Sequence, residues 1–247
     1  MNKRIMVVSA HPADWCTRAG GALLKYAEAG WDITVLVLTY GEHGESASFW
    51  ASNPGTTVEA CKRCREDEAR EAAKYIGVKN IEFFDYGDYP MAFPPGEERK
   101  LGHRILELRP DLMFTHWPDD PLNMDHEVTG KAVTRAVSAA AMRGALPDTS
   151  PHFIPDIFFF EPTMPHAEFN HFAIDTYLDI GDVFDRKIAA VAKFKAQPQL
   201  IEFYNRCAIN RGIQATDWSR GRGVIKHAEA YKRYTPYLGG SLPLTAL

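Results

Sequence analysis

The chain of 247 residues has no long hydrophobic run. No stretch approaches the roughly 20 apolar residues that cross a bilayer. The apolar run at residues 5–8 is also shorter than the core of a secretory signal peptide, which is about 7 to 15 residues long. These absences argue against a membrane partner and against export, so a cytoplasmic protein is expected.

An excess of positive charge is also missing. Lys and Arg total 28 against 32 Asp and Glu, which gives a formal net charge of -4. A nucleic-acid-binding domain usually carries the opposite balance, because it must neutralise phosphates. The sequence therefore predicts no nucleic-acid partner.

Cysteine is scarce, with four residues in the chain. That number is too small for a disulfide scaffold in a protein of this length. Cys61 and Cys64 have CxxC spacing, but no second Cys/His pair follows at zinc-finger spacing. They are interpreted as two half-buried thiols on a helix.

Apolar runs of strand length alternate with segments of helical period. Strands are predicted at residues 4–10, 32–39, 80–85, 111–115 and 157–161, and helices at 19–30, 58–76, 97–108 and 126–142. This alternation predicts a Rossmann-like, doubly wound α/β fold, in which a mostly parallel sheet carries helices on both faces. The core extends to about residue 165.

The pattern changes after residue 165. A strand is predicted at 176–180, a helix at 183–195 and a further helical stretch from 199, which together make a C-terminal helical and irregular extension of a single domain spanning 1–247. Residues 205–233 hold seven Lys or Arg and two acids. This basic segment is equally consistent with a solvated face and with a wall lined for an anionic substrate.

The ligand crevice of such a sheet forms at the carboxyl ends of the strands where strand order reverses, commonly between the first and fourth strands. The loop after the first strand contains His11 and Asp14, and the loop after the fourth contains His126. Two imidazoles and one carboxylate are a typical protein ligand set for catalytic zinc. The sequence therefore predicts a metal triad of these three residues, with a helix-capping role for Asp14 as the alternative.

Several short motifs resemble the zinc-dependent deacetylase superfamily called PIG-L or LmbE-like. They follow one another over about residues 4–135: His11-Pro-Ala-Asp14, Arg18-Ala-Gly-Gly21, Gly41-Glu-His-Gly-Glu45-Ser46, Arg65-x-x-Glu68 and Met124-Asp-His126. The resemblance implies one Zn²⁺ per subunit, bound by His11, Asp14 and His126. That ligand set agrees with the triad argued from the sheet.

Two positions depart from the deacetylase pattern. Deacetylases of this superfamily usually read His-Pro-Asp-Asp, in which the first Asp is the general base, and this chain has Ala13 there. The later motif usually reads His-Pro-Asp-His, and Asn123 replaces its first His. Because a positioned base contributes roughly 10²- to 10⁴-fold in rate, ordinary amide hydrolysis is not expected.

With these departures, the sequence resembles a smaller branch of the superfamily, the 4-oxalomesaconate hydratases of gallate catabolism. The likeness includes Phe83–Met91, Phe160-Glu-Pro162 and Arg211-Gly-Ile-Gln-Ala. It implies a hydratase that adds water to a carbon–carbon double bond of an unsaturated 2-oxo polycarboxylate. Glu45 and His166 would transfer protons, with His171 a competitor for the acid, while zinc would either polarise the substrate or activate water.

A small anionic substrate also needs binding groups. Five residues are assigned to substrate binding: Arg18, Arg65, Asn123, Asp125 and Arg211. The guanidinium groups are chosen because they bind carboxylates in a bidentate fork. For Arg65, an ion pair with Glu66 or Glu68 on its own helix is an equal alternative.

Two other functions remain open at this point. One is a PIG-L-type N-deacetylase that uses Glu45 as a substitute base, and the other is a non-catalytic metal-binding relative. A homo-oligomer is expected because relatives in the hydratase branch look oligomeric, and residues 231–247 offer a tail that could pack on a neighbouring subunit.

Overall fold

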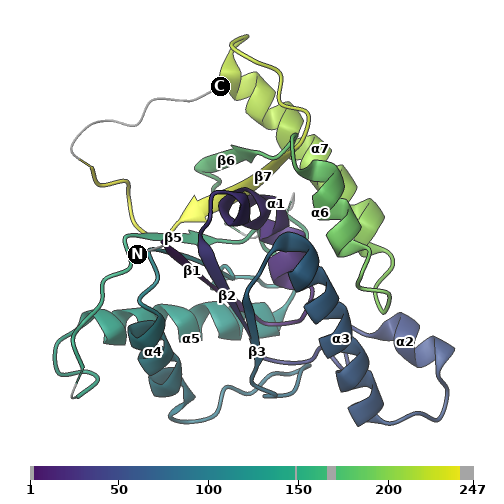
Figure 1. Cartoon of the computed structure of the whole chain (residues 1–247), viewed down its shortest axis with the longest axis vertical. Coiled ribbons are helices and arrows are strands. Elements are labelled where there is room, and N and C mark those ends of the chain that lie inside the picture. The colour runs from purple at the N-terminus through teal and green to yellow at the C-terminus, as the bar shows by residue number, and fades with distance from the viewer. Residues whose placement is uncertain (1–2, 148, 166–170, 240–247) are drawn as a thin grey trace.

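The computed structural model describes residues 3–147, 149–165 and 171–239 (Figure 1). Its centre is a seven-stranded sheet with the order β3-β2-β1-β4-β5-β7-β6. The strands are β1 (Arg4–Ser9), β2 (Asp32–Val37), β3 (Asn80–Phe83), β4 (Leu112–Thr115), β5 (Asp156–Phe159), β6 (Thr176–Asp179) and β7 (Ala228–Arg233). The first five strands run parallel, whereas β7 pairs antiparallel with both β5 and β6. The predicted mostly parallel α/β fold is confirmed.

Helices cover both faces of the sheet. They are α1 (Asp14–Glu28), α2 (Ala47–Ser52), α3 (Val58–Ile76), α4 (Glu97–Leu108), α5 (Met124–Ala141), α6 (Phe184–Val191) and α7 (Leu200–Ser219). Figure 1 shows α4 and α5 together on one side of the strands and α1, α3 and α6 together on the other. Along the described stretches of chain, no helix is both long and apolar enough to cross a membrane.

The first strand illustrates why the sheet is buried on both faces. Successive side chains of a strand point to opposite sides, so a strand covered by helices on both sides is apolar throughout. Ile5 and Val7 belong to the core on the side of α1, α3 and α6. Met6 and Val8 belong to the core on the side of α4 and α5. The uninterrupted apolar run of β1 thus anchors both layers.

The structure differs from the sequence prediction in three elements. Helix α1 begins at Asp14 rather than at residue 19, because the chain turns into the helix directly after the first loop. Strand β7 was not predicted, since its sequence Ala-Glu-Ala-Tyr-Lys-Arg lacks a run of β-branched residues. The short helix α2 was also missed. The region after residue 165 therefore contributes two strands to the central sheet as well as helices.

The strand order places a crevice where it was expected. Strands β1 and β4 are neighbours, and the chain leaves β1 toward β2 on one side and leaves β4 toward β5 on the other. The segments that follow these strands consequently diverge and leave space at their carboxyl ends. All three predicted metal ligands follow β1 or β4.

Candidate metal centre and active-site cavity

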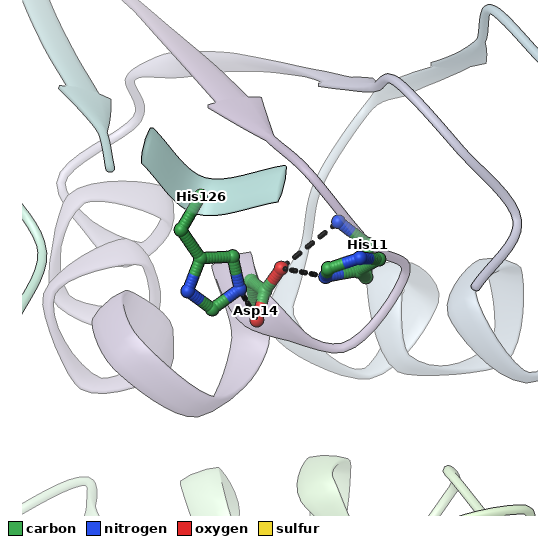
Figure 2. Close-up of side chains that lie close together, drawn as sticks. All are labelled: His11, Asp14 and His126. Carbon is green, nitrogen blue, oxygen red and sulfur yellow. Dashed lines mark hydrogen bonds and ion pairs between the residues drawn. The ribbon is translucent and has the colours of Figure 1, made fainter. Parts of the chain in front are cut away.

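His11, Asp14 and His126 converge at the carboxyl ends of β1 and β4 (Figure 2). His11 follows the end of β1, Asp14 opens α1, and His126 lies in the first turn of α5. All three are buried, and their candidate ligand atoms lie within 4.8 Å of one another. The structure thus brings together the three residues of the predicted triad.

The triad fits a divalent metal ion. Ligand atoms 2.0–2.2 Å from a tetrahedral zinc ion lie about 3.4 Å from one another. His11 Nδ1 lies 3.2 Å from one oxygen of Asp14, and His126 Nε2 lies 3.4 Å from the other. His126 Nε2 is buried without a hydrogen-bond partner. Burying a nitrogen without a hydrogen-bond partner costs free energy unless its lone pair binds a metal ion. A metal ion bound at this nitrogen would therefore account for the missing hydrogen bond.

The far side of each imidazole is held by a carboxylate. His11 Nε2 lies 3.2 Å from Asp125, and His126 Nδ1 lies 2.9 Å from Asp120. Asp120 in turn accepts hydrogen bonds from the backbone N–H and the hydroxyl of Thr163. Metal-binding histidines are commonly oriented in this way. Asp125 was predicted to bind substrate. In the structure it contacts His11 and accepts hydrogen bonds from the backbone N–H groups of residues 89 and 91, so it orients the His11 imidazole.

Electrostatics favour a charged Asp14 in this buried site. Burial acts to raise the pKa of Asp14, but the neighbouring His126 imidazole holds it well below its usual range. Burial likewise acts to lower the pKa of His11, whereas contacts with Asp125 and Asp14 raise it well above its usual value. The carboxylate therefore remains ionised, which is the state in which it ligates a metal.

His116 is a third buried histidine at the site, beside His11 and His126, and it was not predicted from the sequence. Its Nε2 accepts the backbone N–H of Ala10 at 3.0 Å, and its ring stacks on that of His126 with 4.1 Å between centroids. Burial and the charge of His126 lower its pKa well below its usual value. It is a neutral imidazole that supports the triad. Its position directly after β4, comparable with that of His11 after β1, was the signal available in the sequence.

A cavity of about 360 Å³ opens onto the triad. Residues of α1 and α7 and of the segments that follow β1 to β5 form its wall. They include Ala13, Arg18, Glu45, Tyr89, Asn123 and Thr163. Ala13 lines the cavity with a methyl group at the position where a deacetylase-like chain would carry its carboxylate. The cavity is large enough for a small organic acid.

Glu45 is the carboxylate that faces the triad from the opposite wall. One of its oxygens lies 3.9 Å from His11 Nδ1 and accepts a hydrogen bond from the Tyr89 hydroxyl at 3.1 Å. The other oxygen accepts a hydrogen bond from the Gln197 amide. The ring of Tyr89 stacks on His11, with 5.8 Å between centroids. Tyr89 and Gln197 were not predicted as site residues, because both come from irregular segments.

The predicted substrate-binding arginines occupy different environments. Arg18 lines the cavity, with Nε 3.5 Å from Asp14. Arg65 is fully buried beneath the wall and pairs with Glu68 at 2.6 Å, which was the alternative for this residue. Arg211 is also buried and pairs with Glu161. Neither Arg65 nor Arg211 is among the residues that line this cavity, and both guanidinium groups pair with neighbouring side chains, so their contact with substrate stays a prediction.

The remaining predicted residues are placed as follows. Asn123 lines the cavity and caps α5, where its side-chain oxygen accepts the backbone N–H of His126 at 3.3 Å. His166 lies outside the described residues. His171 is exposed and is not part of the cavity wall described here.

Comparisons with known proteins identify relatives that match most of the chain. A sequence model of the family described as PIG-L, GlcNAc-PI de-N-acetylase, matches residues 6–137. A 4-oxalmesaconate hydratase from Pseudomonas putida KT2440 is 38% identical over 86% of this chain and 81% of its own length. The crystal structure of GalB, the 4-carboxy-2-hydroxymuconate hydratase from Pseudomonas putida KT2440, superposes with a TM-score of 0.89 at 35% identity, covering 98% of this chain and all of that one. This chain is therefore a homologue of a hydratase.

Deacetylases share the same fold at lower identity. The N,N'-diacetylchitobiose deacetylase from Pyrococcus horikoshii superposes with a TM-score of 0.78 at 19% identity, covering 94% of this chain and 83% of that one. At this level of identity the likeness concerns the fold. It agrees with the predicted LmbE-like architecture.

Proposed function

The chain belongs to the PIG-L family, and from that membership together with the geometry of its cavity we propose that it is a zinc-dependent hydratase. Its substrate would be an unsaturated 2-oxo polycarboxylate such as 4-oxalomesaconate. The names of the Pseudomonas putida relatives support this choice of substrate class.

One observation carries the proposal. The Glu45 carboxylate lies 3.9 Å from His11, while the residue directly before Asp14, Ala13, presents a methyl group to the cavity. An amide hydrolase of this fold would use a base beside the metal aspartate, and that base is missing. A carboxylate on the opposite wall suits a reaction that adds water to one face of a planar, conjugated substrate.

Hydration needs a base for the water and an acid for the carbon. Zinc bound by the triad would supply Lewis acidity for the 2-oxo acid end of the substrate or for water. Glu45 takes the proton from the water, because it is a carboxylate of the cavity wall that lies outside the triad and 3.9 Å from His11 Nδ1. His166 remains the proposed acid.

Arg18 provides positive charge for a carboxylated substrate. Its side chain lines the cavity beside Asp14, and its Nη1 donates to the backbone carbonyl of Glu161. This anchoring leaves the guanidinium charge to offset substrate carboxylates within the cavity. Arg206, which was not predicted as a site residue, adds a second guanidinium to the wall.

The proposal is tested by an ultraviolet assay with 4-oxalomesaconate beside an acetate-release assay with N-acetylglucosamine derivatives. Hydration removes conjugation, so absorbance is expected to fall with a single product formed. Acetate release without loss of absorbance would instead establish the deacetylase alternative. No turnover in either assay with zinc-loaded protein would favour a non-catalytic relative.

Gly44→Ala is expected to reduce turnover by disturbing Tyr89. A Cβ atom at Gly44 would lie 2.0 Å from the Tyr89 ring, so the ring must move. Movement would break the hydrogen bond to Glu45 and the stacking on His11, and kcat should fall about tenfold. Steady-state kinetics measures this effect. Gly181→Ala is the matched control, because its Cβ would meet only Asp179, at 3.2 Å. Equal kcat in the two variants would contradict the role of Tyr89.

A further inference from the structure

Gln197 links the buried interior to the Glu45 carboxylate. It lies on the connection between α6 and α7 and is 5% exposed. Its side-chain oxygen accepts a hydrogen bond from Arg65 Nη2 at 2.7 Å, and its amide nitrogen donates to Glu45. Arginine can only donate hydrogen bonds. The amide oxygen must therefore face Arg65, and the NH₂ group must face Glu45.

The Arg65 side chain, to which Gln197 is hydrogen-bonded, is itself held in place by its neighbours. Its side chain is fully buried, donates to Glu68 at 2.6 Å and lies against the ring of Phe194. Glu68 also accepts the backbone N–H of Ala196 at 2.9 Å. The segment that carries Gln197 is thus tied to α3 through both its backbone and its side chain.

The other oxygen of Glu45 accepts a second hydrogen bond, whose donor is also oriented by a neighbouring side chain. The Tyr89 hydroxyl donates to Glu45 and accepts from the Asn123 amide nitrogen at 2.9 Å. The side-chain oxygen of Asn123 is occupied by the backbone N–H of His126. Glu45 is consequently held between a donor on each side, and both donors have orientations set by groups deeper in the protein.

We propose that Gln197 is a positioning residue that holds the Glu45 carboxylate against the metal triad. The inference rests on the proposed function, in which Glu45 is the base. Glu45 extends from a loop by a flexible side chain that is 20% exposed, so packing alone does not fix it. Small displacements of a reacting group cost large factors in rate. Gln197, anchored to buried Arg65, supplies one of two constraints on this carboxylate, and the Tyr89 hydroxyl supplies the other.

A double-mutant cycle tests this inference. The unaltered protein, Gln197→Leu, Glu45→Ala and the double variant are compared for kcat and KM on 4-oxalomesaconate and for zinc content. Gln197→Leu is expected to lower kcat roughly 10- to 100-fold, the scale of a hydrogen bond to a charged group, with little change in KM or zinc. In the Glu45→Ala background the same change is expected to have no further effect, because Gln197 acts through Glu45.

Gln197→Glu separates positioning from general support of the fold. It preserves the shape of the side chain and its acceptor for Arg65, but it removes the donor to Glu45. Its kcat is expected to fall at least as far as that of Gln197→Leu, because two adjoining carboxylates repel each other, and circular dichroism should show that the fold is retained. Full activity of Gln197→Glu would overturn the inference.

The remaining outcomes distinguish failure of the inference about Gln197 from failure of the proposed function. If Glu45→Ala is impaired and Gln197→Leu costs the same factor in both backgrounds, Gln197 is only a structural residue and the inference alone is wrong. If Glu45→Ala retains full activity, Glu45 is not the base, and both the proposed mechanism and the inference are wrong.

Discussion

His126→Ala is expected to remove bound zinc and nearly all turnover. The substitution deletes one of three ligands and leaves a site that cannot hold the ion tightly. Because the metal supplies several kcal/mol of stabilisation to developing charge, kcat/KM should fall on the order of 10³-fold or more. Helix α5 keeps its Asn123 cap, so circular dichroism should show a folded protein. Elemental analysis measures the zinc.

Two further variants sharpen this result. His103→Ala removes an exposed histidine on α4 and should leave the zinc content unchanged. Asp120→Ala removes the carboxylate behind His126 and should weaken zinc binding by only about 10- to 100-fold. Stoichiometric zinc in both His126→Ala and His11→Ala would refute the triad, whatever happens to activity.

The triad could be predicted from the sequence because its members follow the ends of buried strands. The run at residues 4–10 identifies β1, and the carboxyl end of a parallel strand fixes where the next residues lie. His11 and His126 therefore had defined positions before any side chain was placed. The same reasoning could have identified His116, which follows β4 directly, but no metal-ligand motif drew attention to it.

The arginines show what sequence reasoning leaves open. A guanidinium suits an anionic substrate, but residue type does not tell which way the side chain points. Arg65 lies on the face of α3 that packs inward, and its partners include Gln197, 132 residues away. Arg211 meets Glu161 across 50 residues. Such long-range pairs depend on how α3 and α7 pack, which hydrophobic periodicity does not specify.

The contacts of Asp125 and Gln197 could not be predicted from the sequence, for related reasons. Asp125 precedes His126 by one residue, and neighbouring residues of a helix point about 100° apart, so its carboxylate reaches His11 rather than the cavity. Gln197 lies in an irregular connection whose path no periodic pattern describes. The residues closest to the chemistry could thus be found from strand ends and motifs, whereas those that orient them required the packed structure.

Glu45→Ala is expected to lower kcat roughly 10²- to 10⁴-fold, the contribution of a positioned general base. Zinc content should be unchanged, because Glu45 is outside the triad. Loss of ultraviolet absorbance from 4-oxalomesaconate measures the rate. Glu59→Gln, which alters an exposed acid in the first turn of α3, is the control and should behave like the unaltered protein.

Glu45→Gln isolates the proton transfer from every other role of this side chain. A glutamine at this position can accept from Gln197 through its oxygen, whereas its NH₂ group meets the Tyr89 hydroxyl, which must turn away because it now donates toward this position. The shape of the side chain and one hydrogen bond are therefore retained while the ability to take a proton is lost. Glu45→Gln should consequently be as slow as Glu45→Ala, and circular dichroism should show a folded protein. Near-normal turnover by Glu45→Gln would mean that Glu45 only binds substrate and that another group removes the proton from water.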